Sequence, residues 1–150
     1  MFLTFSLCIF FALILFGCAN HTNEETTQHD VEFTKLSASY SVDQTPSNLA
    51  KELLSKQDAV KNIKAVNSTD QLLIGIEIDH MQRFRLKEIE KELEKEMKKK
   101  FDDYKIELSM DKKIVLELEE LENKIQQKTI KKKKLEKEID RIIKLSHEQT

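Results

Sequence analysis

The strongest constraint on the fold is a change in hydrophobic period between residues 72 and 108. The first apolar run alternates with other residues and contains Leu72, Ile74, Ile76 and Ile78. Such alternation predicts a β-strand, which is apolar on both faces at its start. The spacing then becomes three or four residues, at Leu86, Ile89, Leu93, Met97 and Phe101. This spacing predicts an amphipathic helix over 83–101. Alternation returns at Tyr104, Ile106 and Leu108, as expected of a further strand.

Upstream residues complete a small domain. Thr45-Pro46 is typical of a helix start, and the leucines that follow predict a helix over 46–57. A strand around 63–66 is followed by the turn residues Ser68-Thr69-Asp70, which predicts a hairpin with the strand after it. The order α-β-β-α-β-α predicts an α+β fold over residues 46–125. We expect a small mixed three-stranded sheet with helices packed on one face.

A long C-terminal helix is expected after Asp111. Nothing breaks a helical pattern until about Lys144, which corresponds to roughly 50 Å. Its apolar seam contains Ile114, Leu118, Leu121, Ile125, Leu135, Ile139 and Ile142. Lys128 and Lys132 interrupt that seam, which argues against a perfect coiled coil. We therefore expect the first half to pack on the sheet and residues 126–150 to form a basic helical extension. This extension could dimerise, bind a protein partner or fold back.

The densest basic cluster is Lys131, Lys132, Lys133 and Lys134. One interpretation is a solvated helix face. The other is a contact with an anionic surface, either lipid head groups or cell-wall polymers, since each lysine near such a surface contributes about 1 kcal/mol.

The N-terminal run ends at Cys18. Residues 2–17 carry no charge and as a helix would span roughly 24 Å, less than the ~30 Å hydrocarbon core. This length suits a signal peptide over residues 1–17. Leu15-Phe16-Gly17-Cys18 resembles the lipobox of bacterial lipoproteins. The resemblance implies cleavage before Cys18, acylation of its thiol and anchoring on the extracytoplasmic face of the cell membrane. An uncleaved membrane anchor is the alternative.

Residues 18–45 are expected to hold the lipidated cysteine and a flexible tether. The stretch after Cys18 is rich in small polar and acidic residues, and about 27 such residues reach roughly 25–30 Å on average. Within it, residues 31–42 are half apolar, which is compatible with a short edge strand or a folded-back contact.

No catalytic pattern is present. The sequence has no G-x-S-x-G, no metal-ligand spacing among its four histidines and no glycine-rich phosphate loop. We therefore expect a protein that is not an enzyme and needs no cofactor or metal. The 25 basic and 27 acidic residues are nearly balanced, which argues against nucleic-acid binding.

Three parts of the chain carry a family resemblance: the lipobox, the hairpin AVKNIKAVNSTDQLLIGIEID and the segment KIELSMDKKIVLELEELENK. Together they resemble the bacterial sporulation lipoprotein family of the YhcN/YlaJ type. The Ile74-Gly75-Ile76 strand matches the family's pattern, whereas the Gly-Asn turn of the family is Ser68-Thr69-Asp70 here. The resemblance implies a spore-associated lipoprotein, at the cell membrane or spore inner membrane, that acts in sporulation, germination or outgrowth through a small α/β binding module. A general envelope adaptor that assembles through its C-terminal helix is the alternative.

Overall fold

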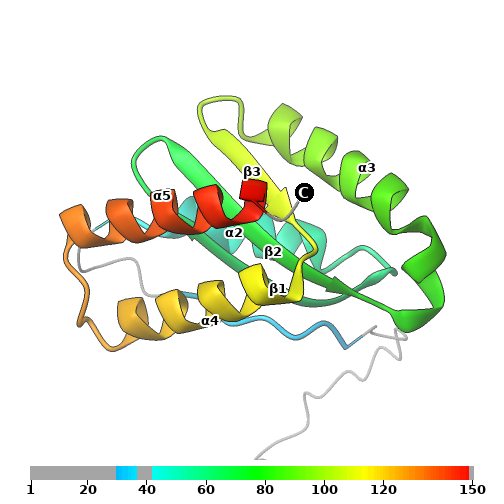
Figure 1. Cartoon of the computed structure of the whole chain (residues 1–150), viewed down its shortest axis with the longest axis horizontal. Coiled ribbons are helices and arrows are strands. Elements are labelled where there is room, and N and C mark those ends of the chain that lie inside the picture. The colour runs from blue at the N-terminus through cyan, green and yellow to red at the C-terminus, as the bar shows by residue number, and fades with distance from the viewer. Residues whose placement is uncertain (1–29, 37–41, 149–150) are drawn as a thin grey trace, which may run out of the picture.

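The computed structural model describes residues 30–36 and 42–148 (Figure 1). The predicted signal peptide, Cys18 and the first part of the tether lie outside the described residues.

Within the described residues the strands form one three-stranded sheet in the order β1-β2-β3. The strands are β1 (Val60–Asn67), β2 (Gln71–Ile78) and β3 (Lys105–Ser109). β1 and β2 are antiparallel across the predicted hairpin, whereas β2 and β3 are parallel. The most apolar strand therefore lies in the centre, and the predicted α+β class with a mixed sheet is confirmed.

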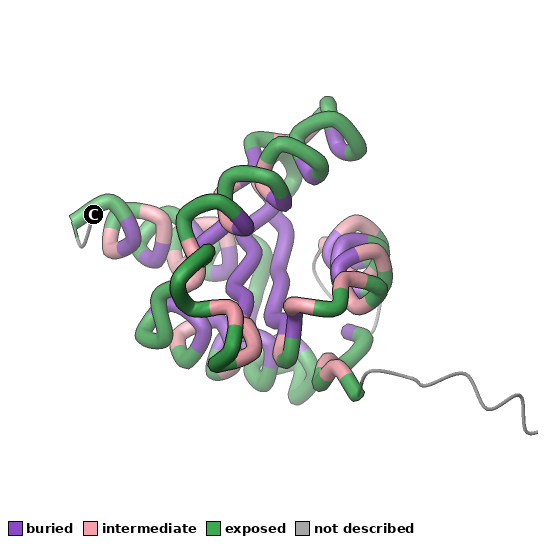
Figure 2. The backbone as a smooth tube through the Cα atoms, turned by 90° about the vertical axis from the view of Figure 1, so that its right-hand side faces the viewer, coloured by how far each residue is buried: buried purple, intermediate pink, exposed green. Residues whose placement is uncertain are grey.

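Helices cover both faces of the sheet, so the expectation of helices on one face is wrong. They are α2 (Thr45–Leu54), α3 (Leu86–Lys100), α4 (Lys112–Gln126) and α5 (Lys132–Glu148), and a 3-10 helix, η2 (His80–Arg85), precedes α3. Figure 2 shows the buried strands enclosed by helices whose outer turns are exposed. The physical reason is that β1 and β2 are buried on both faces over most of their length. Such strands need a cover on each side.

Two separate hydrophobic clusters result from this arrangement. The first joins one face of the sheet to α2 and α3, and includes Leu54, Ile63, Ile76, Leu93 and Met97. The second joins the other face to α4 and α5, and includes Val66, Leu73, Leu118, Leu121, Leu135, Ile139 and Ile142. The second cluster spans the boundary expected after residue 125, because both sides of that boundary contribute buried side chains.

Gly75 in β2 lets α4 lie close to the sheet. A Cβ at this position would stand 2.9 Å from Leu118 Cδ1 and 3.3 Å from Val115 Cα. Only a residue without a side chain allows this approach.

The predicted continuous helix from Asp111 to Lys144 is wrong, because the chain turns between α4 and α5. Lys128 has a φ of 56°, in the left-handed region. The Lys128 amide donates to the Ile125 carbonyl at 3.0 Å and the Thr129 amide donates to the Lys124 carbonyl at 3.0 Å. These two bonds form a Schellman motif that ends α4. Folding the helix into a hairpin lets α5 bury its own apolar seam, which a straight helix would leave in water.

Residues 30–36, which were expected to belong to a flexible tether, are docked on the domain. The Glu32 amide donates to the Lys61 carbonyl at 2.7 Å, and the Ile63 amide donates to the Glu32 carbonyl at 2.9 Å. Leu36 is buried in the second cluster. This segment pairs with the free edge of β1 through a single parallel bridge. Residues 31–36 therefore make a folded-back contact of the kind anticipated for residues 31–42, of which 37–41 lie outside the described residues.

Lys128→Gly should stabilise the protein by about 1 kcal/mol, because glycine adopts the left-handed conformation without the steric cost that a Cβ imposes. Chemical denaturation monitored by circular dichroism measures the change. The matched control is Lys124→Gly, one turn earlier, which should destabilise by roughly 0.5–1 kcal/mol as glycine does inside helices. If both variants are destabilised alike, α4 and α5 form one continuous helix.

Candidate functional site

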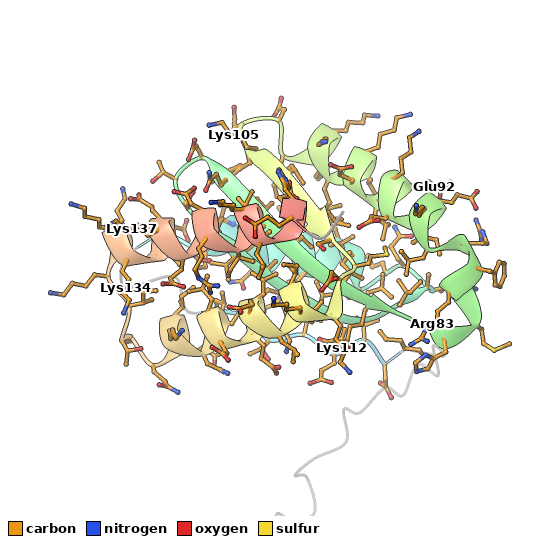
Figure 3. All side chains as sticks on the ribbon, viewed as in Figure 1. Arg83, Glu92, Lys105, Lys112, Lys134 and Lys137 are labelled. Atoms are coloured by element: carbon orange, nitrogen blue, oxygen red, sulfur yellow. The ribbon has the colours of Figure 1, made fainter. Side chains whose placement is uncertain are left out.

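The lysine cluster lies where α5 begins. Lys131, Lys132, Lys133 and Lys134 are all exposed, and they lie at the tip of the α4–α5 hairpin. Figure 3 shows Lys134 and Lys137 projecting from one end of the long axis of the molecule. Lys132 approaches Glu136 at 4.0 Å, with both side chains largely exposed. Among the described residues, no ion-pair partner faces the other three lysines of the cluster.

This placement carries an energetic cost. The N-terminus of an α-helix has a partial positive charge, so acidic side chains stabilise the first turn and basic ones destabilise it. The first turn of α5 contains no acidic residue and begins within the lysine cluster. Apart from the approach of Lys132 to Glu136, the cluster is therefore a concentration of positive charge that the fold does not neutralise locally.

The apolar seam of α5 faces inward. Leu135, Ile139 and Ile142 are fully buried against α4 and the sheet. Arg141 joins the two helices through an ion pair with Glu117 at 2.5 Å. Gln71 at the start of β2 also donates to Asp140 at 3.0 Å. The described part of residues 126–150 therefore folds back on its own domain, as the third alternative anticipated.

A groove that the sequence did not predict lies at the opposite end of the sheet. Because β2 and β3 are parallel, their carboxyl ends meet there, and open α/β sheets commonly bind ligands at this edge. The groove has a volume of about 800 Å³ and is bordered by η2 and by the start of α4. Its lining residues are Lys61, Glu77, Ile78, Asp79, His80, Arg83, Leu86, Met110 and Lys112. They come from three separate stretches of chain, at 61, 77–86 and 110–112, so no single local sequence motif marks the groove.

Charges of both signs line this groove. Lys61 Nζ lies 3.3 Å from Asp79 Oδ2. The amide of Met81 donates to Asp79 at 2.9 Å, and this bond together with Lys61 lowers the pKa of the Asp79 carboxyl. Within the part of the chain that the structure describes, Arg83 and Lys112 have no acidic partner. A guanidinium of this kind can donate two parallel hydrogen bonds to a carboxylate or phosphate.

The most deeply buried charges lie at the outer edge of β1. Lys51 from α2 is fully buried and its Nζ contacts Glu122 Oε1 from α4 at 2.5 Å. The same ammonium donates to the Thr34 carbonyl at 2.7 Å, and the Glu122 carboxylate accepts from the Ala65 amide at 2.9 Å. The pair thus connects two helices, β1 and the docked N-terminal segment.

Burial is the main influence on both groups of this pair. It lowers the pKa of Lys51 and raises the pKa of Glu122, while the attraction between the two charges opposes each shift. This pair contacts backbone groups of two further segments. Its position therefore indicates a structural role. The sequence offered no signal for it, because lysine and glutamate are abundant on every helix of the chain.

Neither a metal cluster nor a membrane-spanning helix occurs in the described ranges 30–36 and 42–148. No group of three or more His, Cys, Asp or Glu side chains converges there, and no helix there is long and apolar enough to cross a bilayer.

Comparison with known proteins finds no matching family model, no matching curated protein and no matching solved structure.

Glu122→Gln should destabilise the protein by about 3–5 kcal/mol, because it leaves the Lys51 ammonium buried without its counter-charge. The double variant Lys51→Met/Glu122→Gln should recover most of this loss, since the glutamine oxygen can still accept from the Ala65 amide. Urea denaturation of the single and double variants measures the difference. Glu94→Gln removes the exposed pair with Lys98 and is the control, with an expected loss below about 1 kcal/mol.

The pH dependence provides a second readout for the same pair. Because burial raises the pKa of Glu122 above its ordinary value of 4.5, the folded state binds more protons here than the unfolded state just above that pH. The contribution of this group to the unfolding free energy therefore falls as pH rises through that range. The double variant should lack this slope. An identical slope in both proteins would contradict the buried, charged pair.

Proposed function

We propose that this chain is a lipid-anchored, extracytoplasmic binding protein of the bacterial envelope and not an enzyme. By its resemblance to sporulation lipoproteins, we propose that it acts in sporulation, germination or outgrowth. The observation that carries the proposal is the uncharged N-terminal run that ends in Leu15-Phe16-Gly17-Cys18. Cys18 is twelve positions before Asp30, where the docked segment begins, so an acylated Cys18 would hold the folded domain at the membrane.

The size of the domain fits this role. Two small hydrophobic clusters stabilise a three-stranded sheet. Lys134 of the lysine cluster and Arg83 of the groove lining lie at opposite ends of the long axis (Figure 3). A protein of this kind acts by being held at a surface and contacting a second molecule there.

The alternative, an adaptor that assembles through the apolar face of its C-terminal helix, has less support. That face is buried within the chain, and exposing it would uncover side chains of the second cluster. The lysine cluster on the same helix is the part that stays accessible, and we propose that it contacts an anionic cell-wall polymer.

Cys18→Ser should abolish lipid attachment, because a hydroxyl does not replace the thiolate as the nucleophile that receives the acyl-bearing group. Radiolabelled fatty acid should enter the native protein and not the variant. In a deletion strain, spore resistance, germination or outgrowth should change while vegetative growth stays near normal. The native gene should restore the spores and the Cys18→Ser gene should not. Normal spores combined with a vegetative envelope defect would favour the adaptor alternative.

Replacement of the four lysines at 131–134 by glutamine should abolish binding to isolated anionic wall polymer. Native binding should weaken steeply as salt rises, because exposed charges are screened within about 8 Å at physiological ionic strength. The same variant should be equally or more stable to heat, since it removes positive charge from the N-terminal turn of α5. Binding that survives the replacement, or does not respond to salt, would exclude this cluster. Anionic vesicles in a parallel assay distinguish wall polymer from lipid head groups.

A further inference from the structure

An exposed apolar pair lies on η2. Met81 is 78% exposed and Phe84 is 84% exposed, and no residue of η2 is buried. In a 3-10 helix, residues three positions apart are eclipsed, so these two side chains project from the same face. Large apolar side chains this exposed do not contribute to the core, and their pairing on one short helix indicates a contact surface.

Basic side chains accompany this pair on η2 and in the neighbouring groove. Arg83 and Arg85 belong to the same short helix, and Lys112 lines the groove together with Arg83. Arg85 is paired with Glu88 at 3.0 Å, whereas Arg83 and Lys112 have no acidic partner within the described part of the chain. Apolar side chains beside unpaired cations are the combination that binds the interface of an anionic bilayer.

The position at which the N-terminal segment docks on the domain also favours an anionic bilayer as the contact of η2. Glu32, near the start of the docked segment, is hydrogen-bonded to the backbone of Lys61. Lys61 in turn pairs with Asp79, whose side chain caps η2. Residues 30–32 therefore lie on the same end of the domain as the exposed pair, and Figure 1 shows the docked segment running toward that end.

The chain between Cys18 and the docked segment is short. Eleven residues separate Cys18 from Asp30, and together with the flanking bonds they span at most about 40 Å. A lipid on Cys18 would therefore keep the η2 end of the domain within reach of the bilayer. Figure 3 places Arg83 and Lys134 at opposite ends of the long axis, so the lysine cluster would face away from that membrane.

We propose that η2 is a second membrane contact, in which Met81 and Phe84 enter the interface of an anionic bilayer while Arg83 and Lys112 face lipid phosphates. This inference rests on the proposed lipid anchor at Cys18. It gives the domain a defined orientation, with the groove at the membrane and the α4–α5 hairpin toward the wall.

Tryptophan fluorescence can test the contact directly, because the chain contains no tryptophan. Phe84→Trp is introduced into the full chain, which is purified with its lipid and reconstituted in vesicles of phosphatidylglycerol and phosphatidylcholine. The emission of Trp at 84 should shift to the blue, resist quenching by aqueous iodide and be quenched by brominated lipid. The matched control is Gln126→Trp, an exposed position at the far end of α4, which should be quenched by iodide and not by brominated lipid.

Flotation of the same vesicles separates the two proposals. If the protein floats with the vesicles but iodide quenches Trp at position 84 as strongly as Trp at position 126, the η2 contact is overturned and the anchor stands. Lipid quenching at position 126 alone would also overturn it, because the domain would then dock through the lysine end. Protein that does not float would overturn the anchor and with it the orientation. Arg83→Gln/Lys112→Gln should float normally and lose part of the blue shift, and an unchanged spectrum would refute the role of lipid phosphates.

Discussion

The contact on which this fold depends is the buried pair of Lys51 and Glu122 at the outer edge of β1. An edge strand presents unpaired amides that need a partner or a cover. Three successive outward amides of β1 are satisfied by three different parts of the chain. The Ile63 amide donates to the Glu32 carbonyl, and the Ala65 amide donates to the Glu122 carboxylate. The Asn67 amide donates to the Gln44 side chain. Lys51 neutralises the one charged acceptor among them, so α2 and α4, from opposite faces of the sheet, meet around this edge.

Closing that edge has consequences for both ends of the molecule. The docked segment brings the chain from Cys18 onto the domain beside η2, and α4 is held so that α5 can return across the second face. The short 3-10 helix and the lysine-rich hairpin tip are thereby kept apart along the long axis (Figure 3). The proposed membrane contact and wall contact are separable for this reason. Each can be altered without disturbing the residues that hold the other in place.

Local patterns predicted the strands and most helices closely, because hydrophobic period is a property of neighbouring residues. They failed where distant segments compete for the same surface. The start of β2 is apolar on both faces, yet the expected fold placed helices on one face, and only the packed helices show that both faces are covered. The turn at Lys128 contains neither glycine nor proline. The local signal there was the interruption of the apolar seam at Lys128 and Lys132, which argued against a perfect coiled coil but did not predict a turn. The turn forms because the burial of the α5 seam outweighs the cost of one left-handed residue.

The sequence by itself determined the order of elements as far as β3, the mixed sheet and the lipobox-like Cys18, since each depends on residue type at short spacing. Only the tertiary structure decided the covering of both faces, the α4–α5 hairpin, the docking of residues 30–36 and the groove with its exposed neighbour η2. The Lys51–Glu122 pair belongs to this second group. Its partners are seventy-one positions apart in the sequence, and a lysine or glutamate on an amphipathic helix is ordinarily solvated. Long-range packing alone removes these two from water and makes their pairing necessary.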